Sequence, residues 1–184
     1  MMTPSVYKLL TSEGFEWLLP VNDADFEVLT FEGQPRSNLW RPVKMKRLKI
    51  DRRRPLKASD FPSCSGGDMF ILSQVAKDKI GSYLEQYGEL LPLACDDGDF
   101  WTLNVTRLVD ALDESSSQLL RGSDTGEILM IHKHVFRPSG LEQAQLFKLP
   151  QVLRGLIYVT DPFVDMIKAS GLKGLEFVKV WSPD

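Results

Sequence analysis

An α+β fold with mostly antiparallel sheets and few helices is the class that this sequence predicts. Short apolar-rich runs separated by turn residues fill the first third of the chain, which is typical of antiparallel strands. Strands and helices are then mixed without the steady alternation that builds parallel sheets. The last residues, 158–184, show the signals of a strand, a helix and a second strand in that order. We therefore expect a C-terminal strand-helix-strand unit.

Length and composition indicate a folded protein of ordinary charge. A chain of 184 residues with 43% hydrophobic residues can bury a core, on the order of 70% of its unfolded surface. Charged residues make up 26% and the net charge is -3, which argues against disorder and against a dedicated polyanion binder. We expect an N-terminal β-rich lobe over residues 1–60 and an α+β region over 69–184, which can form one domain. The breaker-rich residues 60–67 are the predicted connecting loop.

The start of the chain shows no secretion signal. It lacks a basic segment followed by an apolar one, and no apolar run approaches the roughly 20 residues that a membrane-spanning helix needs. We expect the protein to remain in the cytoplasm without a membrane partner.

Apolar-rich runs in the N-terminal third predict four strands. Turn residues separate them, as expected for antiparallel neighbours. These runs are residues 6–10, 15–21, 26–31 and 43–50.

A strand over residues 69–72 leads into the first predicted helix. Ser73 is a natural cap for it, and we expect Gly88 to end it. The apolar face of this helix contains Ala76, Ile80, Tyr83, Leu84 and Tyr87.

Residues 90–95 and 100–105 are predicted to form a hairpin. Asp and Gly between them tolerate the backbone angles of a tight turn. After the hairpin we expect a short helical turn over 107–112, a polar loop over 114–125 and a strand over 128–136.

The C-terminal unit has the clearest element boundaries. Asp161 is placed to cap a helix, Pro162 suits its first position, and Gly171 can adopt the left-handed conformation that ends it. Residues 175–181 then form a strand, and we expect both of its faces to be partly buried.

Eight of the 22 basic residues lie within the stretch 44–57. This bias is typical of a phosphate-binding surface, but the apolar residues between the charges favour a strand edge that Lys and Arg protect from unwanted pairing. Nucleic-acid binding is therefore the alternative function, and we expect it less than the structural role. The stretch contains Lys44, Lys46, Arg47, Lys49, Arg52, Arg53, Arg54 and Lys57.

The histidines and cysteines give weak signals for chemistry. His132 and His134 would share one face of a strand, as a metal pair requires, yet no further ligand has a characteristic spacing, so we predict no metal site. Two cysteines, Cys64 and Cys95, are too few for a disulfide scaffold, and reduced thiols are the simpler interpretation. A single bridge between them stays open.

Three aspartates in the predicted hairpin turn are the candidate partner-binding residues. Asp96, Asp97 and Asp99 lack the ligand periodicity of a calcium loop, and a turn explains them without function. A protruding acidic turn would nevertheless suit a basic protein partner, since charge complementarity raises association rates.

No catalytic motif is convincing. The segment 63–67 lacks a nucleophile elbow, and Gly66-Gly67 lacks the residues of a phosphate loop or a dinucleotide fingerprint. We expect a protein that is not an enzyme. The four tryptophans are predicted to lie mainly in the core, although an exposed one could anchor an interface.

Three stretches resemble a family of bacterial polymorphic-toxin immunity proteins, the myxobacterial-type immunity domain. The resemblance covers residues 69–184 well and the N-terminal third poorly. It is carried by Phe70-Ile71-Leu72-Ser73 with the following helix to Gly88-Glu89-Leu90-Leu91-Pro92-Leu93, by Asn104-Val105-Thr106-Arg107-Leu108-Val109-Asp110-Ala111-Leu112-Asp113, and by Gly171-Leu172-Lys173-Gly174-Leu175-Glu176-Phe177 with Val180-Trp181.

The resemblance implies a non-catalytic protein that binds and blocks a cognate toxin in the cytoplasm. It implies no cofactor. Such toxins are often nucleases, and an acidic inhibitor would suit a basic nuclease. The motif residues themselves look structural, since we expect Asn104, Asp110 and Asp113 at a strand-to-helix junction that needs side-chain caps.

Overall fold

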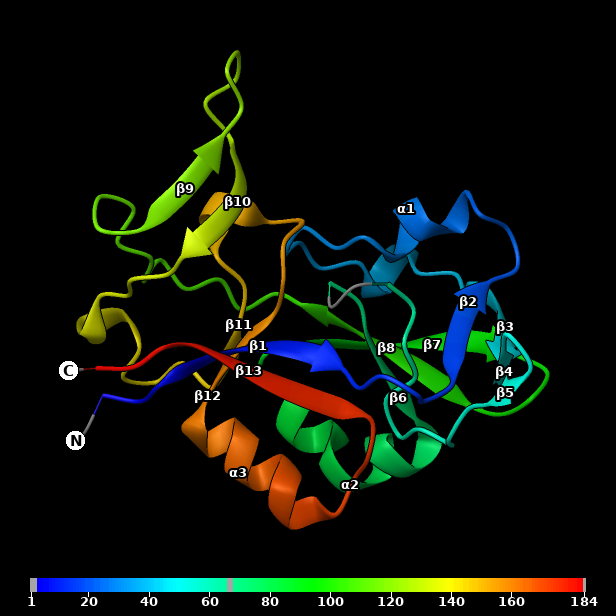
Figure 1. Ribbon diagram of the computed structural model, residues 1–184. Helices are drawn as coiled ribbons and strands as arrows, with labels where there is room; N and C mark the ends of the chain where they lie inside the picture. The colour runs from blue at the N-terminus through cyan, green and yellow to red at the C-terminus, as the bar shows by residue number, and fades with distance from the viewer. Residues whose placement is uncertain (1–2, 66–67, 184) are drawn as a thin grey trace.

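The body of the molecule contains two mainly antiparallel sheets (Figure 1). The computed structural model describes residues 3–65 and 68–183. One sheet contains, in spatial order, β11 (Leu146–Phe147), β12 (Tyr158–Thr160), β1 (Val6–Thr11) and β13 (Leu175–Trp181). The other contains β2 (Trp17–Pro20), β3 (Lys44–Leu48), β7 (Gly88–Cys95), β8 (Phe100–Val105) and β6 (Phe70–Ser73).

Two separate hairpins and several helices complete the structure. The hairpins pair β4 (Ile50–Asp51) with β5 (Arg54–Pro55), and β9 (Gln118–Arg121) with β10 (Ile128–Lys133). The α-helices are α1 (Asp25–Leu29), α2 (Gln74–Leu84) and α3 (Asp161–Ser170). The 3₁₀-helices are η1 (Ser37–Leu39), η2 (Pro138–Gly140) and η3 (Pro150–Val152). The predicted α+β class and the C-terminal strand-helix-strand unit, β12-α3-β13, are thus confirmed.

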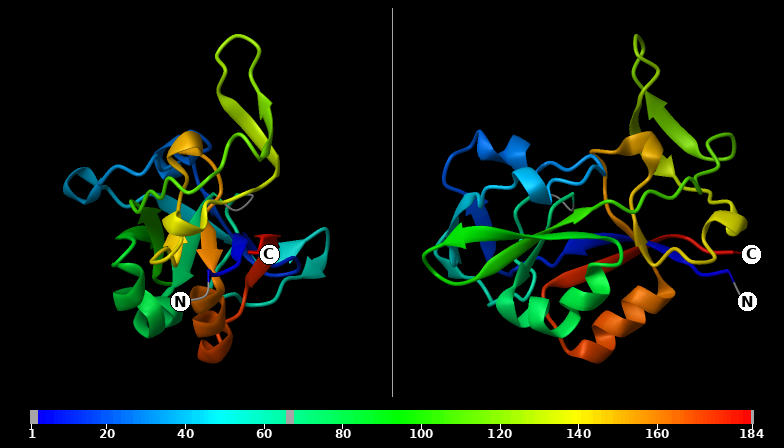
Figure 2. Two further views of the ribbon diagram at one scale, coloured as in Figure 1. Left: turned by 90° about the vertical axis from the view of Figure 1, so that its left-hand side faces the viewer. Right: turned by 180° about the vertical axis from the view of Figure 1, so that it is seen from behind.

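The beginning and the end of the chain share one sheet. Strand β1 lies between β12 and β13 and pairs antiparallel with both, with Tyr7 opposite Val159 on one side and Lys179 on the other. The first and the last strand of the described residues accordingly lie side by side (Figures 1 and 2). Residues from the predicted N-terminal and C-terminal regions therefore form a common sheet.

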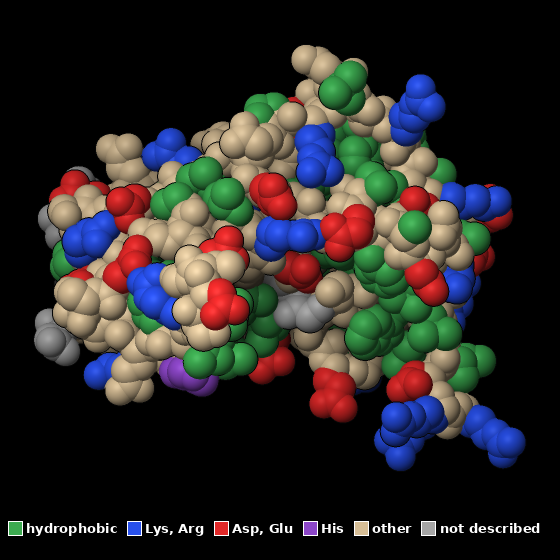
Figure 3. Space-filling model, turned by 90° about the horizontal axis from the view of Figure 1, so that it is seen from above, with side chains coloured by type: hydrophobic (Ala, Val, Ile, Leu, Met, Phe, Trp, Pro, Cys, Tyr) green, Lys and Arg blue, Asp and Glu red, His purple; other side chains and the backbone are tan. Residues whose placement is uncertain are grey.

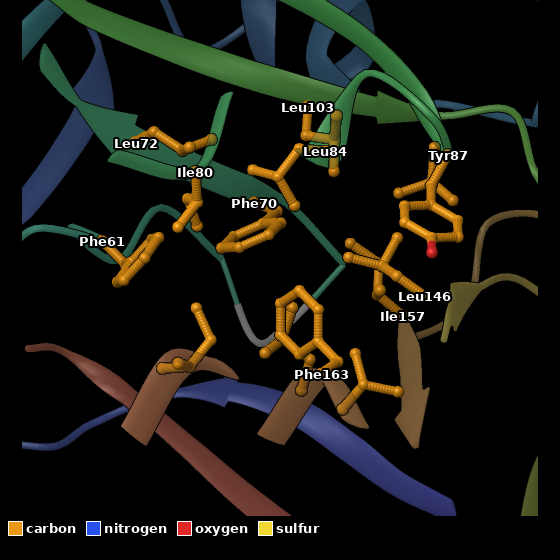
Figure 4. Close-up of a cluster of buried hydrophobic side chains, with 14 of the residues drawn as sticks. Phe61, Phe70, Leu72, Ile80, Leu84, Tyr87, Leu103, Leu146, Ile157 and Phe163 are labelled. Carbon is orange, nitrogen blue, oxygen red and sulfur yellow. The ribbon is translucent and has the colours of Figure 1, made fainter. Parts of the chain in front are cut away.

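The largest core cluster lies where α2 and α3 pack beneath the sheets (Figures 1 and 2). Tyr83 of α2 and Phe163 of α3 have ring centroids 6.1 Å apart, and Phe61 stacks on Phe70 of β6 at 5.4 Å. Removing this apolar surface from water is the main favourable contribution to folding. Figure 4 shows that strands, helices and connecting segments all contribute to it.

Two smaller clusters stabilise the rest of the molecule. One surrounds the aromatic side chains of Phe136, Phe147 and Tyr158 beside the β11-β12-β1-β13 sheet. The other, containing Leu18 and Phe100, lies against the five-stranded sheet. Each of these two clusters contains residues from both the N-terminal and the C-terminal region of the chain.

Several boundaries match the sequence-based predictions. The Ser73 hydroxyl accepts the N–H of Ala76 at the start of α2, as predicted for a cap. Residues 96–99 form the turn between β7 and β8. Gly171 follows α3 with φ of 71°, the left-handed conformation that favours glycine.

The strand predicted over residues 26–31 is wrong. Residues Asp25–Leu29 form α1, because Asn22 starts a helical turn: its side-chain Oδ1 accepts the Ala24 N–H and its carbonyl accepts the Asp25 N–H. This local turn at Asn22 outweighs the apolar-rich character of residues 26–31, although no side chain caps the helix itself.

Gly88 begins β7 and does not end α2, which stops at Leu84. A Cβ at residue 88 would collide with the backbone carbonyl of Asn104 on the neighbouring strand. The glycine is needed for close approach of β7 and β8, and not for a helix terminus.

The helical turn predicted over 107–112 is also wrong, and the polar loop over 114–125 contains β9. The first segment is extended and pairs at single positions with distant residues, Leu108 with Lys148 and Leu112 with Phe136. No helix follows Asn104, so the expected strand-to-helix junction does not exist.

Asp161 is the first residue of α3, and Thr160 occupies the cap position. The Asp161 carboxylate accepts the Ser5 N–H at 2.6 Å and the Tyr7 hydroxyl at 2.7 Å. It therefore anchors the N-terminal strand to the helix. Burial and the Asp161 carboxylate both raise the pKa of Tyr7.

Candidate partner-binding surface

The predicted acidic turn is exposed at the end of the β7–β8 hairpin. Asp96, Asp97 and Asp99 all lie on the surface. Lys49 Nζ lies 3.8 Å from Asp97 Oδ1, and Arg47 donates a hydrogen bond to the Asp97 carbonyl at 3.4 Å. Asp96 and Asp99 form no ion pair with the residues that the structure describes. Two of the three carboxylates are thus available to a partner.

The sequence suggested that the basic stretch 44–57 forms a protected sheet edge, and the structure shows this only in part. Strand β3 is an interior strand at Lys44 and Met45, where β7 pairs with it in parallel; beyond Met45, β2 is its only paired neighbour in the described residues. The stretch continues into the β4–β5 hairpin, where Arg52 and Arg53 occupy the turn with φ of 45° and 68°. These two side chains are exposed.

Arg47 is a structural residue. Its guanidinium donates two hydrogen bonds of 2.8 Å to Glu16, whose side chain is 3% exposed. The same carboxylate accepts the Ser59 N–H at 3.0 Å. The hydrogen bond with Glu16 is the main cause that raises the pKa of Arg47.

The charges of the basic stretch are therefore divided among different surroundings. Arg47 pairs with Glu16, Lys49 with Asp97, and Lys57 Nζ lies 5.7 Å from the centre of the Phe15 ring. On the face seen from above, basic, acidic and apolar side chains are intermixed (Figure 3). Three of the eight basic side chains therefore already interact with other residues of the chain.

The two histidines do not form a pair on one face. His132 is exposed, while His134 is buried and its Nε2 lies 3.0 Å from the Tyr158 hydroxyl. Burial, with a smaller effect of Lys8, lowers the pKa of His134 to about 4. His134 is thus neutral at pH 7 and part of the aromatic cluster with Phe136.

Cys64 and Cys95 are free thiols that contact the same apolar cluster. Burial, together with the charge of Asp68, raises the pKa of Cys64 to about 12. In residues 3–65 and 68–183, no group of three or more His, Cys, Asp and Glu side chains is arranged to hold a metal ion.

An apolar groove opens between α1, η1 and the start of β3, with a volume of ≈ 600 Å³. Its apolar walls include Val28, Leu39, Trp40 and Val43. The Leu39 side chain is 90% exposed, so folding buries almost none of it. Arg36, Arg41 and Lys44 also line the groove, with Asp25 as the one acidic residue there among those described.

The loop that forms one wall of this groove is held in place by Glu89 of β7. The Glu89 carboxylate accepts the backbone N–H groups of Arg36 at 2.7 Å and Ser37 at 3.3 Å. Asn104 of β8 donates to Glu89 at 3.0 Å and to the Gln34 carbonyl at 2.8 Å. Burial alone would raise the pKa of Glu89, but these hydrogen bonds outweigh it and lower the pKa.

Trp40 is fixed in the groove wall by its own polar atom. Its Nε1 donates to the Pro92 carbonyl at 2.8 Å, and its ring centroid lies 6.0 Å from that of Phe31. Trp40 therefore does not have to be ordered when a partner binds. Such preorganisation lowers the entropic cost of binding.

Other exposed apolar side chains lie outside the groove. The β9–β10 hairpin projects from the body (Figure 1) and exposes Leu120, Leu129 and Met130. Trp17 is 39% exposed and contributes to a second hollow of ≈ 560 Å³. It is the most exposed of the four tryptophans, whereas the others are half-buried.

Sequence reasoning did not find the groove. The available signal was the segment Pro35-Arg36-Ser37-Asn38-Leu39-Trp40-Arg41-Pro42, where two apolar residues lie between cations and are bounded by prolines. The anchor of this segment, Glu89, comes from a strand far away in sequence, which no local pattern reveals.

In the described residues, no helix is long and apolar enough to cross a membrane.

Comparison with protein families gives a match over residues 95–182 to the Immunity protein family (Imm11). The match covers just under half of the 184 residues and runs from the last residue of β7 through β13. It confirms the resemblance to an immunity protein family and supports a role in toxin immunity. No curated protein matches the chain. The groove segment and its anchor Glu89 lie outside the matched residues, whereas Asn104 lies within them.

Proposed function

We propose that this protein is a cytoplasmic immunity protein that binds a cognate bacterial toxin and blocks the toxin's active site. The family match over residues 95–182 is the observation that carries the proposal. A non-enzymatic inhibitor needs a preformed surface and no catalytic group. The fixed groove wall and the exposed acidic turn are consistent with such a surface.

The acidic turn is the proposed contact with a basic part of the toxin. Asp96 and Asp99 are exposed, and Asp97 lies beside them. Cys95 immediately precedes the turn and pairs with Met45 of β3, next to Lys44 at the groove. The turn and the groove are thus close enough for one partner to contact both. A basic nuclease is the toxin class that this acidic contact suits best.

Co-expression tests this function. A strain that produces the toxin should grow only when the intact chain is produced with it, and the purified proteins should form a stoichiometric complex. Such a complex is expected to bury on the order of 1,600 Å². Growth arrest despite abundant folded chain would refute the proposal.

The contribution of the acidic turn is tested separately. Asp96→Asn with Asp99→Asn should slow association with the toxin and reduce its dependence on salt, since exposed charges mainly affect association rates. Asp124→Asn with Asp165→Asn is the matched control, because it makes the same charge change elsewhere on the surface. Equal association rates for the two double variants would exclude the turn as a contact.

Nucleic-acid binding through residues 44–57 remains the alternative, and the division of its charges argues against it. A salt-sensitive gel shift that is lost on neutralising Arg52, Arg53 and Arg54 would favour it.

A further inference from the structure

We propose that the groove between α1, η1 and β3 receives a segment of the toxin polypeptide that carries an apolar anchor flanked by carboxylates. This inference rests on the proposed function and names the chemistry of the partner segment. It concerns residues that lie outside the family match and that no comparison assigns.

The apolar part of the argument comes from Leu39 and its neighbours. A leucine side chain that is 90% exposed gains nothing from folding, yet here it lies next to Trp40, Val28 and Val43 in one groove. Trp40 is already fixed by Pro92. Trp and Arg are enriched among the residues that contribute most to binding, and here Trp40 and Arg36 lie in the same groove as the exposed Leu39.

The charge of the groove decides which segment fits. Three cations, Arg36, Arg41 and Lys44, line it against one carboxylate, Asp25, although the whole chain has a net charge of -3. Arg36 is partly engaged, because its Nη1 donates to the Val28 carbonyl at 3.2 Å. Arg41 and Lys44 are exposed and have no ion-pair partner in the described residues. Carboxylates on the partner would complement these two side chains.

A protein segment fits the groove better than a nucleic acid does. Asp25 lies in the groove, where it would repel a phosphate. The side chains that form the groove walls are mainly apolar, and several of them are branched. They therefore suit a protein side chain inserted between them. Affinity for phosphates depends on how many of them Lys and Arg neutralise, and this groove has three such cations beside Asp25.

The test measures the affinity of the chain for the toxin domain against which it protects. That toxin domain carries a substitution that inactivates its active site. Arg41→Glu with Lys44→Glu should raise the dissociation constant about tenfold or more. Arg41→Lys with Lys44→Arg keeps both charges and should bind like the unaltered chain. Lys133→Glu with Lys173→Glu makes the same net charge change at exposed positions away from the groove and should have little effect.

Leu39→Ala tests the apolar contact. Because Leu39 is exposed, this variant should unfold at the same denaturant concentration as the unaltered chain, yet bind the toxin about tenfold more weakly. Leu129→Ala, which truncates another exposed leucine, is its control.

Three outcomes would overturn the inference. The first is a dissociation constant within twofold of the unaltered chain for both groove variants. The second is tighter binding after Arg41→Glu with Lys44→Glu, which would indicate a basic segment. The third is that Arg41→Glu with Lys44→Glu abolishes binding of a duplex oligonucleotide by the chain but leaves its affinity for the toxin unchanged. Failure of the unaltered chain to bind the toxin would instead refute the proposed function.

Discussion

Glu16 shows how a single buried charge connects distant parts of the chain. Its carboxylate accepts two hydrogen bonds from Arg47 on β3 and one from the Ser59 backbone. Without the negative charge of Glu16, the Arg47 guanidinium would lose its ion-pair partner. Breaking a buried pair by altering one member is strongly destabilising, because the other charge stays desolvated.

We therefore expect Glu16→Gln to lower the free energy of unfolding by about 3 kcal/mol. Urea denaturation measures this change. Glu114→Gln is the matched control, because Glu114 pairs with Arg121 on the surface, where such pairs contribute about 0–1 kcal/mol. Equal losses for the two variants would show that the Glu16–Arg47 pair behaves like an exposed one.

His134 makes stability depend on pH in a defined range. Its pKa in the folded state is about 4, against 6.5 when it is exposed. The unfolded state therefore binds more protons between these values, and stability falls as the pH decreases from about 6.5 to 4.

The expected loss from His134 is about 2–3 kcal/mol over this range. His134→Gln, which cannot titrate, should remove that part of the pH dependence, whereas His132→Gln should retain it because His132 is exposed. Denaturation curves at pH 4, 5, 6 and 7 provide the measurement. A His134→Gln slope identical to that of the unaltered chain would contradict the assignment.

At the scale of elements, the β7–β8 hairpin depends on one glycine. Strand β7 approaches β8 so closely at Gly88 that a methyl group would overlap the Asn104 carbonyl. The hairpin also holds Glu89 and Asn104, which fix the groove loop. A disturbance at Gly88 is thus transmitted directly to the candidate surface.

Gly88→Ala should cost about 2–4 kcal/mol, because backbone atoms cannot move away as easily as side chains. Gly126→Ala should cost only about 1 kcal/mol, since its φ of 70° is unfavourable for alanine but the space around it is empty. Thermal and urea denaturation would rank the two variants. If Gly126→Ala were the more destabilising variant, β7 and β8 would be able to move apart at residue 88 without loss of stability.

Elements defined by nearby residues could be predicted, and elements defined by distant ones could not. The β7–β8 hairpin, the Ser73 cap and the end of α3 at Gly171 each depend on a few adjacent residues. Residues 107–112 are extended because they pair with Lys148 and Phe136. The sequence of residues 107–112 does not indicate that Lys148 and Phe136 are their partners.

The candidate surface likewise has one part that the sequence could predict and one part that it could not. The acidic turn was visible because its three aspartates are almost consecutive, whereas the groove requires α1, η1 and β3 to meet. One cause of this omission was the strand predicted over residues 26–31, because the apolar-rich run that contains Phe26, Val28 and Leu29 forms the short helix α1 instead.

At the scale of the whole molecule, Lys148 joins the N-terminal segment to the C-terminal half. Its ammonium group is buried and donates to the Phe31 carbonyl at 2.8 Å and to the Leu153 carbonyl at 3.0 Å. Burial lowers the pKa of Lys148 to about 8, although Asp68 and Glu32 oppose the effect. The unfolded chain therefore binds more protons than the folded one between pH 8 and about 10.5.

Stability should accordingly rise with pH across this range, by about 2–3 kcal/mol from Lys148 alone. The comparison is with Lys148→Met, which has no charge to bury and should lack this increase. Urea midpoints at pH 7.5, 8.5 and 9.5 for both proteins provide the measurement. Parallel curves would show that the ammonium group gains enough from its two carbonyl partners to titrate normally.

The position of β1 between β12 and β13 has a consequence for synthesis. Strands β12 and β13 follow β1 far along the sequence, so Val6 and Leu9 gain their strand neighbours only after the C-terminal strand-helix-strand unit has been made. This sheet therefore cannot form before those residues exist. Until then, the apolar side chains of β1 have no sheet to cover them.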